Sequence, residues 1–199
     1  AGVWIRIVGD RAEISVDASG EHLHRRGWAT HRTEAPLREN LAAVLVMLGR
    51  FDARRELLID PMAGSGTVAI EAALMARAAH CWKVGDEPLC FRLPAFDVRP
   101  DLPRALFSDT EPLIIASDID TRAIEMIEDN ADAAGVGRWV KAVHLDVRHL
   151  TPKLVAKHLP EAADTQSGLI LSNPPYGERL SGGELDLYYD LGEACRSFP

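Results

Sequence analysis

The sequence is short of cysteines and has no long apolar run, and both shortages exclude classes of protein. Three cysteines in 199 residues are too few for a disulfide framework, so a reducing compartment is expected. No apolar stretch approaches the roughly 20 residues that cross a bilayer, and the first residues lack the anatomy of a signal peptide. We therefore expect a cytoplasmic protein with no membrane contact. Cys81 and Cys90, with His80, lack the paired spacing of zinc ligands, so no metal is expected.

The chain also lacks an excess of positive charge. Its net charge is −8, whereas proteins that bind nucleic acid unaided normally carry a face rich in lysine and arginine. Basic side chains do gather near the N-terminus, at His22, His24, Arg25, Arg26, His31 and Arg32. A solvated surface explains this cluster as well as a binding surface does. If the substrate is a nucleic acid, much of the binding must come from a domain outside this chain.

Apolar periodicity predicts an α/β protein with a parallel, doubly wound sheet. Short apolar strands alternate with amphipathic helices, and ligands of such sheets bind at the carboxyl ends of the strands. The strands are expected at 57–60, 113–117, 139–144 and 168–172, and the helices at 67–79, 121–134, 152–158 and 184–196. Residues 80–112 show no clear periodicity and are interpreted as an insertion.

A smaller unit is predicted ahead of this sheet. Alternating apolar residues at 3–8 and 13–18, around Gly9-Asp10-Arg11, indicate a β-hairpin. Pro36 then suits the first turn of a helix that ends at Gly49. We therefore divide the chain into a hairpin and linker, 1–34, and a cofactor-binding domain, 35–199. The sequence stops soon after the fourth strand, so the last strands of the usual sheet are expected to be missing.

The turn from Asp60 to Thr67 is the first chemical motif. It joins an apolar strand to a helix, and Gly64 and Gly66 remove side chains where a nucleotide-like ligand would cross the backbone. A phosphate-binding loop would need a lysine after the last glycine, and a dinucleotide fingerprint would have a third glycine where Ala69 stands. The cofactor-binding candidates here are Asp60, Pro61, Ala63, Gly64, Ser65, Gly66 and Thr67.

Acidic residues follow the next two strands. Asp118 can accept hydrogen bonds from both ribose hydroxyls, with Ile119 packed on an adenine. The alternative is that Asp118 or Asp120 caps the following helix, a role we favour for Asp120. Asp146, followed by Val147, suits acceptance from the adenine amino group, although a loop aspartate without a ligand is nearly as good an interpretation.

The second chemical motif is Asn173-Pro174-Pro175-Tyr176, directly after the fourth strand. An exocyclic amine is a poor nucleophile, and acceptors around its N–H groups orient its lone pair. The Asn173 side-chain carbonyl and the Pro174 backbone carbonyl are such acceptors. Pro175 stiffens the loop and Tyr176 offers a face on which a base can stack. With the glycine turn, this motif predicts an S-adenosylmethionine-dependent methyltransferase acting on an exocyclic amine. A stiff loop without chemistry is the alternative.

The sequence resembles the methyltransferase domain of the THUMP-containing RNA guanine-N2 methyltransferases, and most of all the bacterial 23S ribosomal RNA members. The resemblance is carried by residues 19–27, 35–43, 60–73, 117–120 and 172–180. It implies a class I, Rossmann-like fold, S-adenosylmethionine as cofactor, and methyl transfer to N2 of a guanosine in RNA, with residues 173–176 as the catalytic loop. It also implies that a THUMP domain supplies RNA binding. Ala63 replaces the cysteine usual in this turn.

Three other functions stay open at this point. The Asn-Pro-Pro-Tyr motif also serves adenine-N6 methylation of DNA, and a transfer RNA guanine is a further substrate class. A non-catalytic RNA-binding or assembly module that retains the cofactor fold is the alternative from another class. Arg26 and Glu39 either fold over the cofactor or target base or belong to ordinary surface.

Overall fold

A four-stranded parallel sheet forms the centre of the protein. The computed structural model describes residues 2–17, 22, 24–31, 37–77, 110–165, 167–175 and 184–198. The strands are β3 (Leu57–Asp60), β4 (Leu113–Asp118), β5 (Val140–His144) and β6 (Gly168–Ile170). They lie in the order β5-β4-β3-β6, and each neighbouring pair is parallel. The order reverses at β3, which places the topological switch point of the sheet between β3 and β6.

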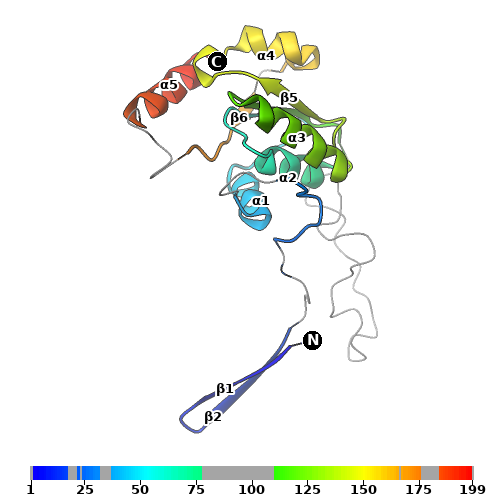
Figure 1. The fold of residues 1–199 in the computed structure, drawn as a ribbon, viewed down its shortest axis with the longest axis vertical. Helices are drawn as coiled ribbons and strands as arrows, with labels where there is room; N and C mark the ends of the chain where they lie inside the picture. The colour runs from blue at the N-terminus through cyan, green and yellow to red at the C-terminus, as the bar shows by residue number, and fades with distance from the viewer. Residues whose placement is uncertain are drawn as a thin grey trace.

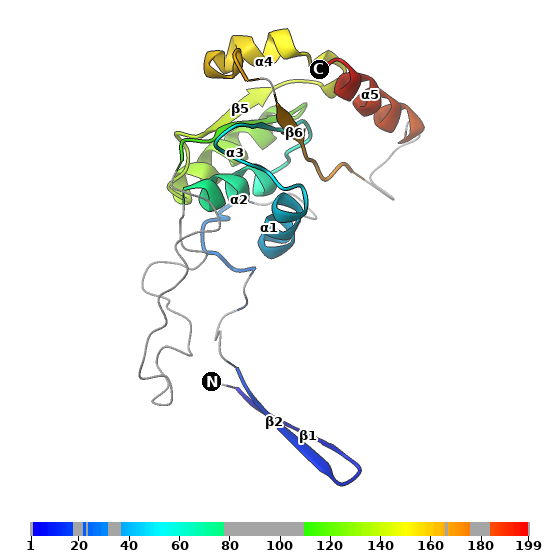
Figure 2. The ribbon, with the colours of Figure 1, turned by 180° about the vertical axis from the view of Figure 1, so that it is seen from behind.

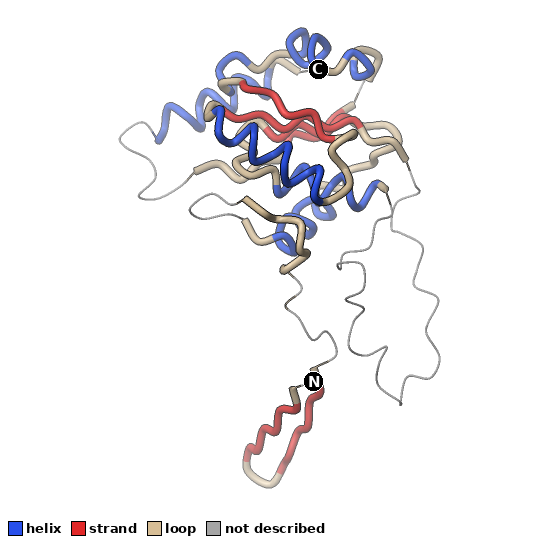
Figure 3. Tube along the Cα trace, turned by 45° about the vertical axis from the view of Figure 1, so that its right-hand side comes forward, coloured by secondary structure: helices blue, strands red, loops and turns tan. Residues whose placement is uncertain are grey.

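Helices cover both faces of this sheet, as Figure 3 shows. The first face carries α1 (Glu39–Leu48), α2 (Thr67–Ala76) and α3 (Thr121–Ala133). The second carries α4 (Pro152–His158), α5 (Glu184–Arg196) and the short 3-10 turns η2 (Val147–His149) and η3 (Pro160–Ala162). The predicted doubly wound α/β architecture is therefore confirmed.

Alternation along the strands divides the core in two. In β3, Leu58 packs against α1, α2 and α3, whereas Leu57 and Ile59 pack against the helices of the second face. Ile114 and Ile115 of β4 divide in the same way, because successive side chains of a strand point to opposite faces. Strands buried on both faces have almost continuous apolar sequences, which is the pattern seen here.

Helix α2 lies in the middle of the first face and is enclosed on nearly all sides. Nine of its ten residues are buried, and the exception is Met75. Its hydrophobic residues alternate with several alanines, which lets α1 and α3 approach it closely. Because α2 begins directly after the glycine turn, this enclosure fixes the position of the turn relative to the sheet.

The hairpin consists of β1 (Val3–Val8) and β2 (Arg11–Val16) and stands apart from the sheet (Figures 1 and 2). The turn contains only Gly9 and Asp10, so β2 begins at Arg11 and the predicted range 13–18 was wrong by two residues. Gly9 has a positive φ of 56°, as tight two-residue hairpin turns require. Every residue of both strands is exposed.

Helix α1 also begins later than predicted. Arg38 is its N-cap and Glu39 its first residue, so the helix starts after Pro36, which lies outside the described residues. Among the described residues, no helix combines the length and apolar composition that a membrane crossing requires.

Candidate active site

The carboxyl ends of all four parallel strands open into one cavity of about 510 Å³ at the switch point of the sheet. This volume suits a nucleoside-sized ligand. The lining comes from the segments after β3, β4, β5 and β6, from α5, and from Leu37 before α1. The lining residues are Leu37, Asp60, Pro61, Met62, Ala63, Gly64, Ser65, Thr67, Val68, Asp118, Ile119, Leu145, Asp146, Val147, Arg148, Asn173, Pro175, Asp186, Leu187 and Asp190.

The glycine turn forms the floor of this cavity. Gly64 and Gly66 have φ values of 55° and 83°, a left-handed conformation that disfavours other residues. Gly64 lines the cavity but Gly66 does not: a Cβ added to Gly66 would lie 3.2 Å from Ile127 and 3.3 Å from Ile70, in the core of the first face. The lack of a side chain at Gly66 therefore serves helix packing, which differs from the role predicted for it. The Ala63 N–H donates to the Ser117 carbonyl at 2.9 Å, which ties the turn to the end of β4. The first N–H groups of α2 follow directly.

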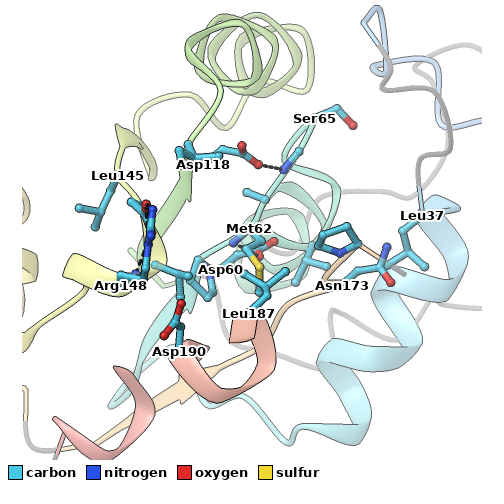
Figure 4. Close-up of a pocket in the computed structure, with 18 of the residues that line it drawn as sticks. Leu37, Asp60, Met62, Ser65, Asp118, Leu145, Arg148, Asn173, Leu187 and Asp190 are labelled. Carbon is cyan, nitrogen blue, oxygen red and sulfur yellow. Dashed lines mark hydrogen bonds and ion pairs between the residues drawn. The ribbon is translucent and has the colours of Figure 1, made fainter. Parts of the chain in front are cut away.

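Asp118, at the end of the neighbouring strand β4, stabilises the turn through a hydrogen bond. Its Oδ2 accepts a hydrogen bond from the Gly64 N–H at 2.9 Å (Figure 4). Its Oδ1 accepts one from the Asp120 N–H at 3.0 Å. A carboxylate has further acceptor positions, so both bonds are compatible with ribose binding. Asp120 caps α3 by accepting from the Arg122 N–H, as expected, and Ile119 is 62% exposed at the cavity.

The asparagine–proline loop lies across the cavity from the turn. Leu57, Leu58 and Ile59 of β3 pair with residues 168–170 of β6, and the Leu171 N–H still donates to the Ile59 carbonyl at 3.0 Å. This register delivers Asn173 and Pro175 to the cavity, where Asn173 lies beside Leu37 (Figure 4). Pro174 is half-buried and does not line the cavity, and Tyr176 lies outside the described residues.

One hydrogen bond joins the glycine turn to Ser172, the residue directly before the asparagine–proline motif. The Ser172 hydroxyl donates to Asp60 Oδ1 at 2.7 Å, and the Met62 N–H donates to the same oxygen at 3.4 Å. Burial is the main cause that raises the pKa of Asp60 to about 7, and these two bonds oppose it. Asp60 therefore links the base of the turn to the base of the loop.

Asp60 should give the unliganded protein a measurable pH dependence. Between about pH 4 and pH 7 the folded state holds a proton that the unfolded state has lost, so the free energy of unfolding should fall as pH rises. The slope from this group is up to about 1.4 kcal/mol per pH unit. Urea unfolding of wild type and Asp60→Asn from about pH 5 to about pH 8 isolates it. A difference between the two proteins that does not change with pH would contradict this assignment.

Asp146 has a partner that the sequence did not suggest. Its carboxylate accepts from the Arg148 N–H at 2.9 Å and from the Arg148 guanidinium, whose Nε lies 3.0 Å away. These bonds lower the pKa of Asp146. Arg148 itself lines the cavity near Asp190 of α5 (Figure 4). Three aspartates form this pattern with an arginine two residues later, in the pairs Asp52–Arg54, Asp120–Arg122 and Asp146–Arg148. The Asp-x-Arg spacing was therefore the signal in the sequence that could have predicted the Arg148 partner.

The cavity carries an excess of negative charge. Five of the twenty lining residues are aspartates, at positions 60, 118, 146, 186 and 190, and Arg148 is the single cation among these described residues. Burial raises the pKa of Asp60 to about 7 and Arg148 pairs with Asp146, so the excess comes mainly from Asp118, Asp186 and Asp190. Phosphate groups would be repelled by this arrangement, whereas a cationic ligand would be favoured. The aspartates of α5 were not predicted, because nothing in the sequence tells which face of that helix turns toward the cavity.

Arg26 and Glu39 do not fold over the cavity. The Arg26 guanidinium forms two hydrogen bonds of 3.1 Å with Glu71 of α2, and the two side chains are 9% and 2% exposed. Glu39 is buried at the start of α1 and contributes to the raised pKa of Glu71, whose main cause is burial. Both residues therefore belong to the interior of the first face rather than to ordinary surface.

A switch-point cavity with a bare glycine turn on one side and an asparagine–proline loop on the other defines a class I, Rossmann-like methyltransferase fold. The chain belongs to the family of RMKL-like methyltransferase domains, which it matches over residues 26–197. Two relatives are named ribosomal RNA large subunit methyltransferase K/L. The one from Methylococcus capsulatus is 37% identical to this chain, and the one from Syntrophotalea carbinolica is 35% identical to it. These alignments cover 96% and 94% of this chain but 26% and 27% of the relatives. The chain also aligns with YpsC of Bacillus subtilis at 32% identity, over 96% of this chain and 49% of YpsC.

Solved structures agree with the fold. A protein from Listeria monocytogenes described as a predicted N6-adenine-specific DNA methylase has a TM-score of 0.74 and 30% identity, covering 99% of this chain and 50% of its own. SMU.472, a methyltransferase solved with S-adenosylhomocysteine, has a TM-score of 0.73 and 29% identity, covering 98% of this chain and 49% of its own. The chain thus spans about half or a quarter of the length of these proteins.

Proposed function

We propose that this chain is the catalytic part of an S-adenosylmethionine-dependent methyltransferase that modifies N2 of a guanosine in ribosomal RNA. The observation that carries the proposal is the meeting of the glycine turn and Asn173 across one cavity. Ribosomal RNA as substrate is supported by the K/L relatives, and the cofactor by the ligand of SMU.472. The methyltransferase domain is assigned to residues 35–199, and residues 26–31 of the preceding hairpin and linker pack on it through Arg26 and Trp28.

The charges of the cavity support this cofactor over phosphate-bearing ones. S-adenosylmethionine carries a sulfonium and an ammonium group and no phosphate, so a cavity with an excess of carboxylates, from Asp118, Asp186 and Asp190, suits it better than it suits a dinucleotide. In this assignment the methionine part crosses Gly64, the ribose hydroxyls bind Asp118, and the adenine lies between Ile119 and Asp146. Pro61, Ala63, Ser65, Thr67 and Val147 complete the contacts.

The protein side of the chemistry is positioning. The Asn173 amide oxygen and the Pro174 carbonyl accept from the target amine and orient its lone pair toward the sulfonium methyl. Pro174 and Pro175 restrict the backbone, and Tyr176 stacks the extruded base. The nitrogen–carbon bond forms as the sulfur–carbon bond breaks, the sulfur keeps that electron pair, and the amine then loses a proton. RNA binding depends in large part on a domain outside this chain, because the chain is acidic overall.

Methylation of defined substrates tests this proposal. The full-length protein is incubated with tritiated S-adenosylmethionine and either 23S ribosomal RNA, transfer RNA or DNA, and the products are digested to nucleosides. We expect N2-methylguanosine from the ribosomal RNA, identified by mass spectrometry. If methylated guanosine were found only in the transfer RNA reaction, the proposal of ribosomal RNA as substrate would be wrong. Cofactor binding without transfer to any substrate would favour a non-catalytic RNA-binding module.

Adenine-N6 methylation of DNA is the second candidate. The observation in its favour is the Listeria monocytogenes neighbour, which is described as an N6-adenine-specific DNA methylase. The same asparagine and proline acceptors suit that amine. N6-methyladenine in the DNA reaction, with unmodified ribosomal RNA, would favour this candidate.

A further inference from the structure

Asn130 of α3 is a polar side chain with no exposed surface, yet it lies outside the cavity. A buried amide is costly unless its donors and acceptor find partners. Five hydrogen bonds satisfy Asn130, and none of them is to its own helix. At a position that served packing alone, an aliphatic residue would be buried at a lower cost in free energy. The partners of Asn130 therefore indicate what the amide does.

The bonds of Asn130 divide between two segments that are far apart in sequence. Its Oδ1 accepts from the backbone N–H groups of Thr30 and His31 at 2.9 and 3.0 Å and from the Thr30 hydroxyl at 3.1 Å. Its Nδ2 donates to the His31 carbonyl at 2.9 Å and to the Ser65 carbonyl at 3.0 Å. Ser65 is the middle residue of the turn between Gly64 and Gly66. One amide therefore connects residues 26–31, hereafter the strap, with the cofactor turn.

We infer that Asn130 is a positioning residue for the cofactor site, and this inference rests on the proposed function of the glycine turn. The bond to Ser65 holds the carbonyl of the residue that stands between Gly64 and Gly66, two glycines of positive φ whose backbone has wide conformational freedom. The strap bonds orient the amide, since they occupy its oxygen and its other N–H. The strap is in turn anchored to α2 by Arg26 and Glu71.

The inference predicts that the loss of Asn130 lowers the affinity for cofactor but leaves kcat nearly unchanged. Without the Nδ2 donor, the turn should sample conformations that do not bind cofactor, and apparent affinity falls in proportion to the competent fraction. Once cofactor is saturating, the turn is in place, so kcat should change little. The bonds to the strap concern stability, because the strap contributes the buried Trp28 to the core of the first face but no residue to the cavity.

The test compares three variants of the full-length protein by calorimetry with S-adenosylhomocysteine and by thermal unfolding. Asn130→Ala removes all five bonds. Thr30→Ala removes one of them, the hydroxyl bond to Asn130, together with the hydroxyl's bond to the His31 ring, and Val155→Ala removes buried volume from the second face. We expect Asn130→Ala to weaken binding at least about tenfold, with kcat at saturating cofactor within about threefold of wild type. Thr30→Ala and Val155→Ala should lose stability and bind within about twofold of wild type.

Two results would overturn the inference. One is a folded Asn130→Ala protein that binds like wild type. The other is equal weakening by Val155→Ala at matched loss of stability, which would indicate a general effect of destabilisation. If Asn130→Ala does not fold, Asn130→Ser supplies the same comparison, because serine keeps a polar group but is too short to bridge both segments. Wild-type protein that does not bind S-adenosylhomocysteine would contradict the proposed function instead.

Discussion

Replacement of Asn173 by alanine is expected to lower kcat for methyl transfer about a hundredfold to a thousandfold, the usual cost of removing one preorganised polar group from a transition state. The amide oxygen is needed when the target amine becomes tetrahedral, and the cofactor keeps its contacts with the turn and the aspartates. Affinity for S-adenosylmethionine, measured by calorimetry, should therefore stay within about threefold of wild type.

Tyr188→Phe is the matched control for this prediction. The Tyr188 hydroxyl lies 3.4 Å from the Pro175 carbonyl, so its removal loosens the same loop without removing the acceptor of Asn173. We expect kcat for this variant to remain within about threefold of wild type, since the bond is long. Normal turnover by Asn173→Ala, or an equal loss in both variants, would exclude the role given to the Asn173 amide.

Arg26→Ala should destabilise the protein by about 3–5 kcal/mol, because it leaves the Glu71 carboxylate buried without its cation. Removing Arg26 also removes two causes that lower the pKa of Glu71, so that pKa should rise further. The stability of the variant should then fall more steeply than that of wild type as pH rises above about 4.5, since the folded state keeps a proton longer. Urea unfolding at several pH values measures both effects.

Arg54→Ala is the control for this second prediction. Arg54 also forms two hydrogen bonds with a carboxylate, that of Asp52, but its side chain is 60% exposed, so its loss should cost much less stability than the loss of Arg26. Adding Glu71→Gln to Arg26→Ala should recover part of the lost stability and flatten the pH dependence. If Arg26→Ala costs no more than Arg54→Ala, the buried pair does not hold the strap on α2.

The sequence predicted the sheet well because each strand is short, apolar and bounded by turn residues. The ranges 57–60, 152–158 and 184–196 were predicted with their observed ends, and Thr121–Ala133 with an error of one residue. These elements have strong local signals, such as the Asp120 cap of α3 and Thr151 and Pro152 at the start of α4. Errors arose where local signals compete, as at Arg11, which fits a turn and a strand equally.

The candidate site was predictable where the residues follow strands and unpredictable where helices contribute. Asp60 and Asp118 are the last residues of β3 and β4, and Asp146 lies two residues after β5, so the parallel topology alone brings them to one edge. Leu37, Arg148, Asp186 and Asp190 reach the cavity through the packing of α1, η2 and α5, which no short-range pattern encodes. Asn130 and the Arg26–Glu71 pair join segments 65 and 45 residues apart, and single-sequence patterns carry no record of such pairings.

The enclosure of α2 has a consequence for variation within this chain. A helix with a solvent-exposed face tolerates substitutions on that face, because the side chains there make few packing contacts. Residues 67–76 have no solvent-exposed face, because every residue of α2 except Met75 is buried. The side-chain volume is therefore constrained at nearly every position of α2, and most substitutions there require compensating changes in neighbouring residues. We expect sequence variation to concentrate on α3 and α4 instead.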